Sequence, residues 1–179
     1  MVEENYIMNK GFIHVYTGTG KGKTTAALGL AIRAAGAGKK VFIAQFVKSM
    51  EYSEIKTLRL LEGSINVTLY GQGCFITKDP AQEDIIAAKR GLEEVLELLK
   101  SKKYDLIILD ELTIAIFFYL LTIEEVMSVL KQKPFETELV ITGRYAPKEI
   151  IEFADLVTEM VEIKHYYQQG VLSREGIDK

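Results

Sequence analysis

Strand-like and helical patterns of apolar residues alternate along nearly the whole chain of 179 residues. Short runs rich in β-branched and apolar residues predict strands at 12–17, 41–46, 65–70, 104–109, 138–142 and 156–161. Apolar residues spaced three and four apart predict helices at 23–37, 51–62, 79–102, from 112 to about 131, and from Pro147 onward. Because no repeat or proline-rich linker interrupts this alternation, we expect one α/β domain over residues 1–179. Its mostly parallel β-sheet would be flanked by helices, with residues 1–10 as an N-terminal extension.

Composition and charge narrow the classes of partner. The chain is 48% hydrophobic and 26% charged, which is typical of a globular protein. Its net charge of −3 gives no electrostatic reason to expect a nucleic-acid or anionic-membrane partner. The longest apolar run, Leu112 to Ile123, is shorter than the roughly 20 residues that cross a bilayer. With one cysteine, Cys74, and no apolar signal core before Gly11, we expect a cytoplasmic protein without disulfides.

A glycine-rich turn between the first predicted strand and helix carries the clearest chemical signal. It reads Thr17-Gly18-Thr19-Gly20-Lys21-Gly22-Lys23-Thr24-Thr25. Glycines let backbone N–H groups converge, and the helix that follows adds the positive end of its dipole, so the turn suits a polyphosphate. Lys23 would reach a phosphate oxygen and the Thr24 hydroxyl would ligate Mg²⁺. The first glycine comes one residue later than in GxxxxGK[ST], which leaves a flexible turn with a solvated lysine as the alternative.

A pair of acidic residues follows the most apolar predicted strand. Asp110 and Glu111 come directly after Leu106 to Leu109, where a phosphate site needs a carboxylate for its metal shell. The alternative is that they are only the polar end of a strand. Together with the glycine turn, they predict a nucleoside triphosphate with Mg²⁺ or Mn²⁺, but they do not say which bond breaks. A P-loop ATPase or kinase, with Glu111 activating water or an acceptor hydroxyl, and a non-catalytic nucleotide-binding module both stay open.

A series of short motifs, in order along the chain, resembles one known family. The series begins with Gly18 to Ala27 and continues through Arg33 to Gly36, Gln45 to Lys48, Leu109 to Thr113, Ile141 to Arg144, Lys164-His165 and Gly176 to Asp178. These segments are similar to the bacterial P-loop family of cob(I)alamin (corrinoid) ATP:adenosyltransferases. The resemblance covers about residues 11 to 179, and the shortened phosphate loop is the form that this family carries.

The resemblance implies a RecA-like P-loop fold, a homodimer and a specific reaction. The family binds MgATP and transfers the 5′-deoxyadenosyl group to the Co(I) of a reduced corrinoid, either cobalamin or a precursor. Triphosphate is released, and the reaction serves adenosylcobalamin synthesis or salvage. A flavoprotein reductase is the expected source of Co(I). The phosphate chain lies in the loop in the reverse sense to that in ATPases, so that the ribose C5′ faces the corrinoid.

The resemblance also assigns roles by position. Lys23, Thr24 and Glu111 are carried over as catalytic groups, with Thr24, Glu111 and Asp110 at the Mg²⁺. Lys48 is expected on the corrinoid side, unless it is an ordinary surface lysine. The expected contacts with ATP are Gly18, Thr19, Gly20, Lys21, Gly22, Lys23, Thr24, Thr25, Arg33, Gln45 and Arg144.

The chain departs from the family at one informative place. Well-studied members have Gly-Phe-Thr-Trp in a loop whose aromatic residues help to displace the lower ligand of the corrinoid. This chain has no tryptophan, and the corresponding run is Gly71-Gln72-Gly73-Cys74-Phe75-Ile76-Thr77. Either Phe75 and Ile76 supply the apolar wedge on the corrinoid side, or they bury against the core and the displacement is weaker.

Overall fold

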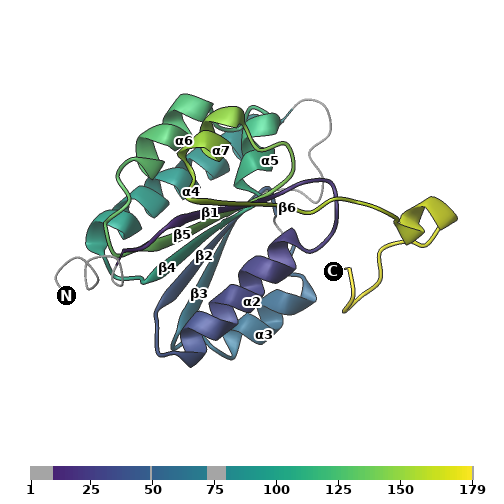
Figure 1. Cartoon of the computed structure of the whole chain (residues 1–179), viewed down its shortest axis with the longest axis horizontal. Coiled ribbons are helices and arrows are strands. Elements are labelled where there is room, and N and C mark those ends of the chain that lie inside the picture. Colours follow the sequence, from purple (N-terminus) through teal and green to yellow (C-terminus); the bar gives the residue numbers. More distant parts are fainter. Residues whose placement is uncertain (1–9, 49, 72–79, 179) are drawn as a thin grey trace.

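The computed structural model describes residues 10–48, 50–71 and 80–178. In this part of the chain the strands form one six-stranded sheet in the order β3-β2-β4-β5-β1-β6, and every neighbouring pair is parallel (Figure 1). The prediction of an α/β fold on a parallel sheet is therefore confirmed. The strands are β1 (Ile13–Thr17), β2 (Val41–Phe46), β3 (Ile65–Tyr70), β4 (Leu106–Asp110), β5 (Glu138–Thr142) and β6 (Leu156–Glu159).

Helices cover both faces of the sheet. In Figure 1, α2 and α3 lie on one face, and α4 to α7 lie on the other. No helix within the described ranges is long and apolar enough to cross a membrane. The helices are α2 (Lys23–Gly36), α3 (Ser53–Arg59), α4 (Gln82–Ser101), α5 (Leu112–Phe117), α6 (Ile123–Leu130) and α7 (Lys148–Phe153), and the 3₁₀ helix η1 is Tyr166–Gln169.

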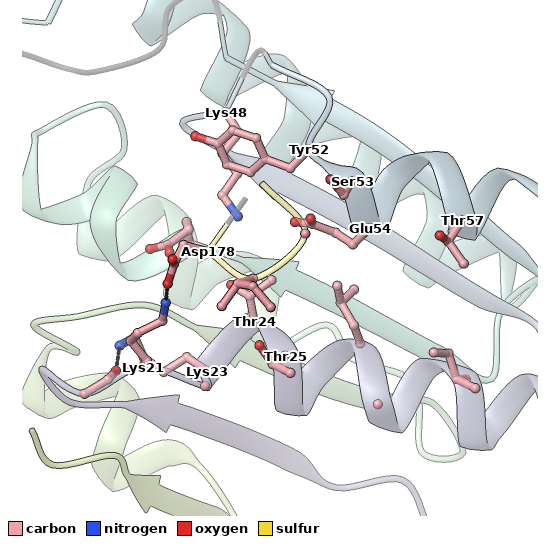
Figure 2. A pocket seen from close by; sticks show the side chains of 18 of the residues that line it. Lys21, Lys23, Thr24, Thr25, Lys48, Tyr52, Ser53, Glu54, Thr57 and Asp178 are labelled. Atoms are coloured by element: carbon pink, nitrogen blue, oxygen red, sulfur yellow. Dashed lines mark hydrogen bonds and ion pairs between the residues drawn. The ribbon is translucent and has the colours of Figure 1, made fainter. Parts of the chain in front are cut away.

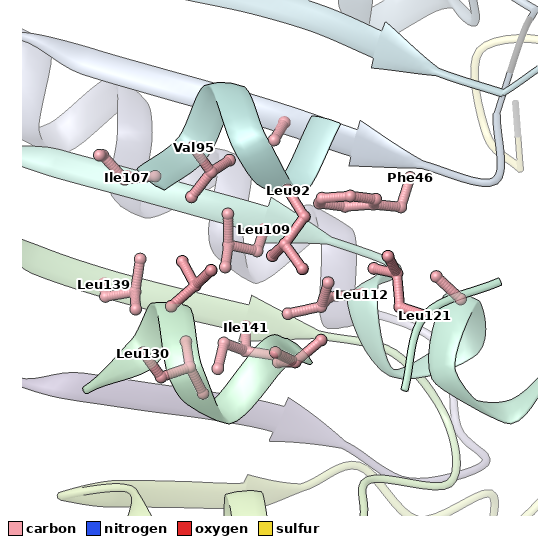
Figure 3. Close-up of a cluster of buried hydrophobic side chains, with 14 of the residues drawn as sticks. Phe46, Leu92, Val95, Ile107, Leu109, Leu112, Leu121, Leu130, Leu139 and Ile141 are labelled. Atoms are coloured by element: carbon pink, nitrogen blue, oxygen red, sulfur yellow. The ribbon is translucent and has the colours of Figure 1, made fainter. Parts of the chain in front are cut away.

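The two helical layers create two apolar cores. β2 and β4 are buried at every position because both of their faces are covered, as parallel sheets require. The larger core lies between the sheet and helices α4 to α7 and includes Phe46, Leu92 and Leu109 (Figure 3). The smaller core lies under α2 and α3. Burial of this apolar surface holds the central strands in place, and these strands carry the polar groups of the site at their ends.

The single helix predicted from 112 to about 131 is wrong. The chain forms two helices, because Tyr119 adopts a left-handed conformation with φ of 58° and Thr122 begins a new helix. The Thr122 side chain accepts a hydrogen bond from the Glu125 N–H (3.1 Å), and the Glu125 carboxylate accepts one from the Thr122 N–H (2.8 Å). This capping box stabilises the start of α6. The unbroken apolar run hid the break between the two helices.

The parallel register brings polar residues of adjacent strands to the carboxyl edge of the sheet. Gln45 on β2 pairs with Asp110, the last residue of β4. Thr142 ends β5 and pairs with Tyr16 of β1. Ligands of open α/β sheets bind outside this edge. The fold therefore places the glycine turn and the acidic pair on the same side of the molecule.

Candidate nucleotide-binding site

The glycine turn is packed so tightly that its glycines cannot be replaced without strain. A Cβ at Gly18 would lie 2.4 Å from the Met160 carbonyl oxygen, and one at Gly20 would lie 2.8 Å from it. Gly18 and Gly22 also have positive φ values of 99° and 110°. The N–H of Gly20 donates to the Met160 carbonyl across 2.7 Å. Met160 directly follows β6, so the end of this strand supports the glycine loop. This geometry requires glycine for a steric and a conformational reason.

Lys23 opens α2 and folds its side chain back into the loop. Its Nζ donates to the carbonyl oxygens of Gly18 (2.8 Å) and Gly20 (2.6 Å), and the residue is buried. Burial and the nearby Arg144 lower the pKa of Lys23, while Glu111 acts in the opposite direction. An anionic ligand in the concavity would favour the charged ammonium. The lysine is thus held where a phosphate would meet both it and the helix N-terminus.

Asp110 is the centre of a buried hydrogen-bond network. Its Oδ1 accepts from the hydroxyls of Thr24 (2.8 Å) and Thr142 (2.6 Å). Its Oδ2 accepts from the Gln45 amide and the Lys48 ammonium, each across 3.0 Å. The residue has no exposed surface. Four donors occupy the two oxygens of the carboxylate, so Asp110 is held in one position and fixes the direction of the Thr24 side chain.

Glu111 follows Asp110 but faces the cleft. Its φ of 59° is left-handed, and its N–H donates to the Thr142 hydroxyl across 3.0 Å. Burial, and secondly the charge of Asp110, raise the pKa of Glu111, and Lys48 and Lys23 oppose this rise. A non-glycine residue in this conformation is strained, which is common where a side chain is aimed at a ligand. Because of this conformation the two consecutive carboxylates point in different directions: Asp110 lies in the buried network and Glu111 lies at the cleft wall.

These groups surround a cleft of about 780 Å³, within the range usual for ligand sites (Figure 2). The glycine loop and the first turns of α2 form one wall, and α3 with the segment before it forms the opposite wall. Four of its seven charged lining residues are cationic, which suits a polyphosphate. The polar lining includes Lys21, Lys23, Thr24, Thr25, Lys48, Glu54, Glu111, Arg144 and Asp178.

A family model described as ATP:corrinoid adenosyltransferase BtuR/CobO/CobP matches residues 9–178. The chain belongs to the ATP:corrinoid adenosyltransferase family. The resemblance that the sequence motifs indicated is therefore confirmed, and the match extends over both the glycine turn and the C-terminal segment.

Similar proteins in three bacteria carry names that agree with this family. The chain is 36% identical to the corrinoid adenosyltransferase of Escherichia coli (strain K12) over 94% of its own length and 86% of that protein. It is 35% identical to the corrinoid adenosyltransferase CobA of Salmonella typhimurium, with the same two coverages. It is 32% identical to the corrinoid adenosyltransferase of Pseudomonas aeruginosa, over 94% of this chain and 84% of that protein.

Most of the expected site residues of this adenosyltransferase-family chain lie together. Residues 20–25, Lys48, Glu111 and Arg144 line the cleft. Gln45 does not line it: the side chain is 1% exposed and donates to Asp110 from beneath. We therefore assign Gln45 to support of the buried carboxylate rather than to direct contact with a nucleotide.

Arg33 lies away from the cleft. It stands in the last turn of α2, about 15 Å along the helix axis from Lys23 at 1.5 Å per residue. There it lines a separate hollow with Lys10 and Glu138, at the amino edge of the sheet. Its neighbour Ile32 still lines the nucleotide cleft, but consecutive residues of a helix lie about 100° apart around its axis, so Arg33 lies on another side of α2 and does not line the cleft.

Lys21 makes contacts that the sequence analysis did not anticipate. Its ammonium donates to the Tyr166 hydroxyl across 2.8 Å and forms an ion pair with Asp178. Asp178 also accepts from the Arg174 backbone N–H (3.0 Å) and its Nε (3.1 Å). The C-terminal segment thus forms part of the cleft wall beside the glycine loop (Figure 2). The matched motif Gly176 to Asp178 was the available signal, but no periodicity linked it to the loop.

The remaining expectations divide by what the structure describes. Phe75 and Ile76, expected on the corrinoid side, lie outside the described residues. Within the described ranges, no three His, Cys, Asp or Glu side chains gather into a metal-binding cluster. A hydroxyl and a carboxylate at the cleft, together with phosphate oxygens, would form a donor set of hard oxygens that Mg²⁺ accepts. Thr24 and Glu111 fit that requirement.

Proposed function

We propose that this chain transfers the 5′-deoxyadenosyl group of ATP to the Co(I) of a reduced corrinoid, cobalamin or a precursor, and releases triphosphate. The proposal rests on one observation above all: Lys23, Thr24 and Glu111 line one cleft, with Asp110 buried behind Thr24, in a chain of the adenosyltransferase family. The similar proteins of Escherichia coli and Salmonella typhimurium are named corrinoid adenosyltransferases.

The proposed reaction asks the protein for position and charge. A bond forms between cobalt and C5′ of the ribose while the bond from C5′ to the triphosphate oxygen breaks, and the electron pair of that bond leaves with triphosphate. Co(I) is itself a strong nucleophile, so no side chain has to act as one. Alignment of the two reactants can be worth roughly 7–11 kcal/mol. Lys23 and Arg144 would stabilise the charge on the leaving group.

We further propose that Glu111, rather than Asp110, is the carboxylate nearest the metal. Asp110 is committed to four donors, whereas Glu111 lines the cleft. Mg²⁺, when bound, would neutralise phosphate charge and help to orient the triphosphate. Thr24 would then hold the metal through its hydroxyl oxygen while its O–H continues to donate a hydrogen bond to Asp110.

A homodimer is also proposed, from the uncovered edge of the sheet. All four residues of β6 are exposed, and an open edge strand is a template for pairing or coverage by another chain. Leu156 is 42% exposed and Ile163, just beyond the strand, is 95% exposed. Coverage of these apolar side chains by a second copy would remove them from water. A flavoprotein reductase is the proposed supplier of Co(I).

Product identification tests the proposed reaction. The protein is incubated with MgATP and a chemically reduced corrinoid, with Lys23→Met as the matched inactive control. We expect equimolar triphosphate and a light-sensitive cobalt–carbon product from the wild type. Formation of ADP without triphosphate, at a rate independent of corrinoid, would instead establish the ATPase or kinase alternative.

A further inference from the structure

An exposed aromatic pair lies on the helical face formed by α4 to α7. The rings of Phe117, at the end of α5, and Tyr145, in the loop between β5 and α7, stack with centroids 4.3 Å apart and an interplanar angle of 28°. Phe118 packs edge-on against Phe117 at 5.3 Å. Phe117 is 48% exposed and Tyr145 is 54% exposed. The pair is therefore ordered by ring contacts while much of its surface remains in water.

The pair is joined to the nucleotide cleft through both of its elements. α5, which carries Phe117, begins directly after Glu111, and Tyr145 directly follows Arg144. Both segments therefore start at a residue that lines the cleft. The Thr113 hydroxyl donates to the Arg144 carbonyl across 2.7 Å and joins the two segments. At Gly143 a Cβ would lie 2.2 Å from the Thr113 hydroxyl oxygen, so the two elements approach as closely as backbone allows.

The conformation of Tyr145 is costly for a solvent-facing residue. Its φ of 58° is left-handed, which costs a non-glycine residue about 1 kcal/mol or more. Half-exposed aromatic rings gain only part of the free energy that burial would give. Because this strained residue directly follows the cleft residue Arg144, a use of its side chain near the cleft is the explanation to test.

The chemistry of the pair identifies which substrate it would meet. The cleft is lined by the glycine loop and by charged side chains, as a triphosphate with its metal requires, whereas Phe117 and Tyr145 offer aromatic rings. A corrinoid is a broad conjugated macrocycle with apolar methyl groups and amide arms. Aromatic rings pack against such surfaces, and the Tyr145 hydroxyl can exchange hydrogen bonds with an amide.

We propose that the Phe117–Tyr145 pair is a contact surface for the corrinoid macrocycle and determines corrinoid affinity. This inference rests on the proposed function, since it takes the corrinoid as the second substrate. Tyr145 directly follows Arg144, so the loop between β5 and α7 would present a cation to the nucleotide and an aromatic ring to the macrocycle.

Truncation of each ring tests the inference. We expect Phe117→Ala and Tyr145→Ala each to raise the KM for reduced corrinoid about 5- to 10-fold, from the usual contribution of an aromatic contact. The KM for ATP and the midpoint of thermal unfolding should stay near those of the wild type. Tyr145→Phe, which keeps the ring, should stay within about twofold. Phe153→Ala, a half-exposed phenylalanine at the far end of α7, is the matched control and should change neither KM.

Equilibrium binding separates this inference from the proposed function. Binding of cobalt(II) corrinoid is followed by its absorbance, with MgATP present and no turnover, and we expect the two truncations to raise Kd by the same factor. An unchanged Kd and KM for corrinoid would overturn the inference, as would an equal rise in the KM for ATP. A shift to monomer on truncation would instead assign the pair to an interface between copies. A wild type that binds corrinoid but forms no adenosylated product would overturn the proposed function alone.

Discussion

The hydroxyl of Thr24 donates a hydrogen bond to Oδ1 of Asp110 across 2.8 Å, from the first turn of α2 to the last residue of β4. The contact joins the two polar elements on which nucleotide binding depends. Because Asp110 is fully buried and accepts from three other donors, its carboxylate has a fixed position. The direction of the Thr24 lone pairs is fixed in turn, which orients a metal ligand before any metal arrives.

Thr24→Val should separate this orientation from simple packing. Valine has nearly the same shape but neither donates to Asp110 nor ligates Mg²⁺, so adenosyl transfer should fall by about 100-fold or more. Unfolding in urea should show a loss of about 1 kcal/mol, the usual net value of a hydrogen bond. Thr24→Ser keeps the hydroxyl and should retain most of the activity. Full activity in the valine variant would show that Thr24 has no part in metal binding.

Asp110→Asn should be one of the most damaging single-atom changes in the chain. The amide cannot accept from all four donors, and Lys48 loses its buried counter-charge, so we expect a stability loss of about 3 kcal/mol. Asp105→Asn is the matched control, because that side chain is exposed at the other end of the β4 segment. Urea denaturation measures both variants.

A double variant tests the physical reason for that loss. If the unpaired Lys48 ammonium is the main cost, Asp110→Asn combined with Lys48→Met should be more stable than Asp110→Asn alone. Burial alone would lower the pKa of Lys48, but Asp110 and Glu111 outweigh that effect and raise it. Additive losses in the double variant would contradict this account.

The regular elements of the fold were predictable because they follow from local patterns. The bounds of β2, β3 and β5 agree with the predicted runs. β2 and β5 are central strands that are buried almost throughout, whereas β3, at the edge of the sheet, is recognisable by its alternation of apolar and polar residues. The break between α5 and α6 was not predictable from apolar spacing, because residues on both sides of it are buried. The capping residues Thr122 and Glu125 mark the start of α6, but their spacing was recognised as a capping box only in the structure.

The candidate site was predictable in its local parts and not in its long-range contacts. Sequence order alone placed Lys23 and Thr24 at a helix start and Glu111 at a strand end. It could not distinguish the orientations of Asp110 and Glu111, which depend on a left-handed residue. Nor could it bring Asp178 to Lys21, since that ion pair closes a loop of more than a hundred residues without any pattern.

Glu111 predicts a pH dependence with a definite sign. Its pKa in the folded state is raised above the ordinary value of 4.5, chiefly by burial and then by Asp110. At a pH between the ordinary pKa and the raised pKa of the folded state, the folded state binds more protons than the unfolded state. The free energy of unfolding should therefore fall as the pH rises through that window. Glu111→Gln removes this fall and should be more stable than the wild type at neutral pH. Urea unfolding over the weakly acidic to neutral range measures the difference.

The same substitution should impair function. Mg²⁺ binding requires the ionised carboxylate, so Glu111→Gln should lower adenosyl transfer by about 100-fold or more. In the wild type, Mg²⁺ affinity should begin to weaken, on acidification, at a higher pH than an ordinary glutamate would give. A variant that is both less stable at neutral pH and fully active would contradict the role of Glu111 on both grounds.

Two helical glycines should respond in opposite directions to alanine. Gly91, in α4, faces the buried ring of Tyr70, and an added Cβ would lie 2.6 Å from the ring carbon Cγ. Alanine favours helix by about 1 kcal/mol over glycine, but overpacking a closed core costs about 1–3 kcal/mol, so Gly91→Ala should be destabilising. Gly29, in α2, has open space where its Cβ would stand, so Gly29→Ala should gain about 1 kcal/mol. Urea denaturation of the two variants compares the same chemical change in two environments, and a gain at Gly91 would mean that Tyr70 can move aside.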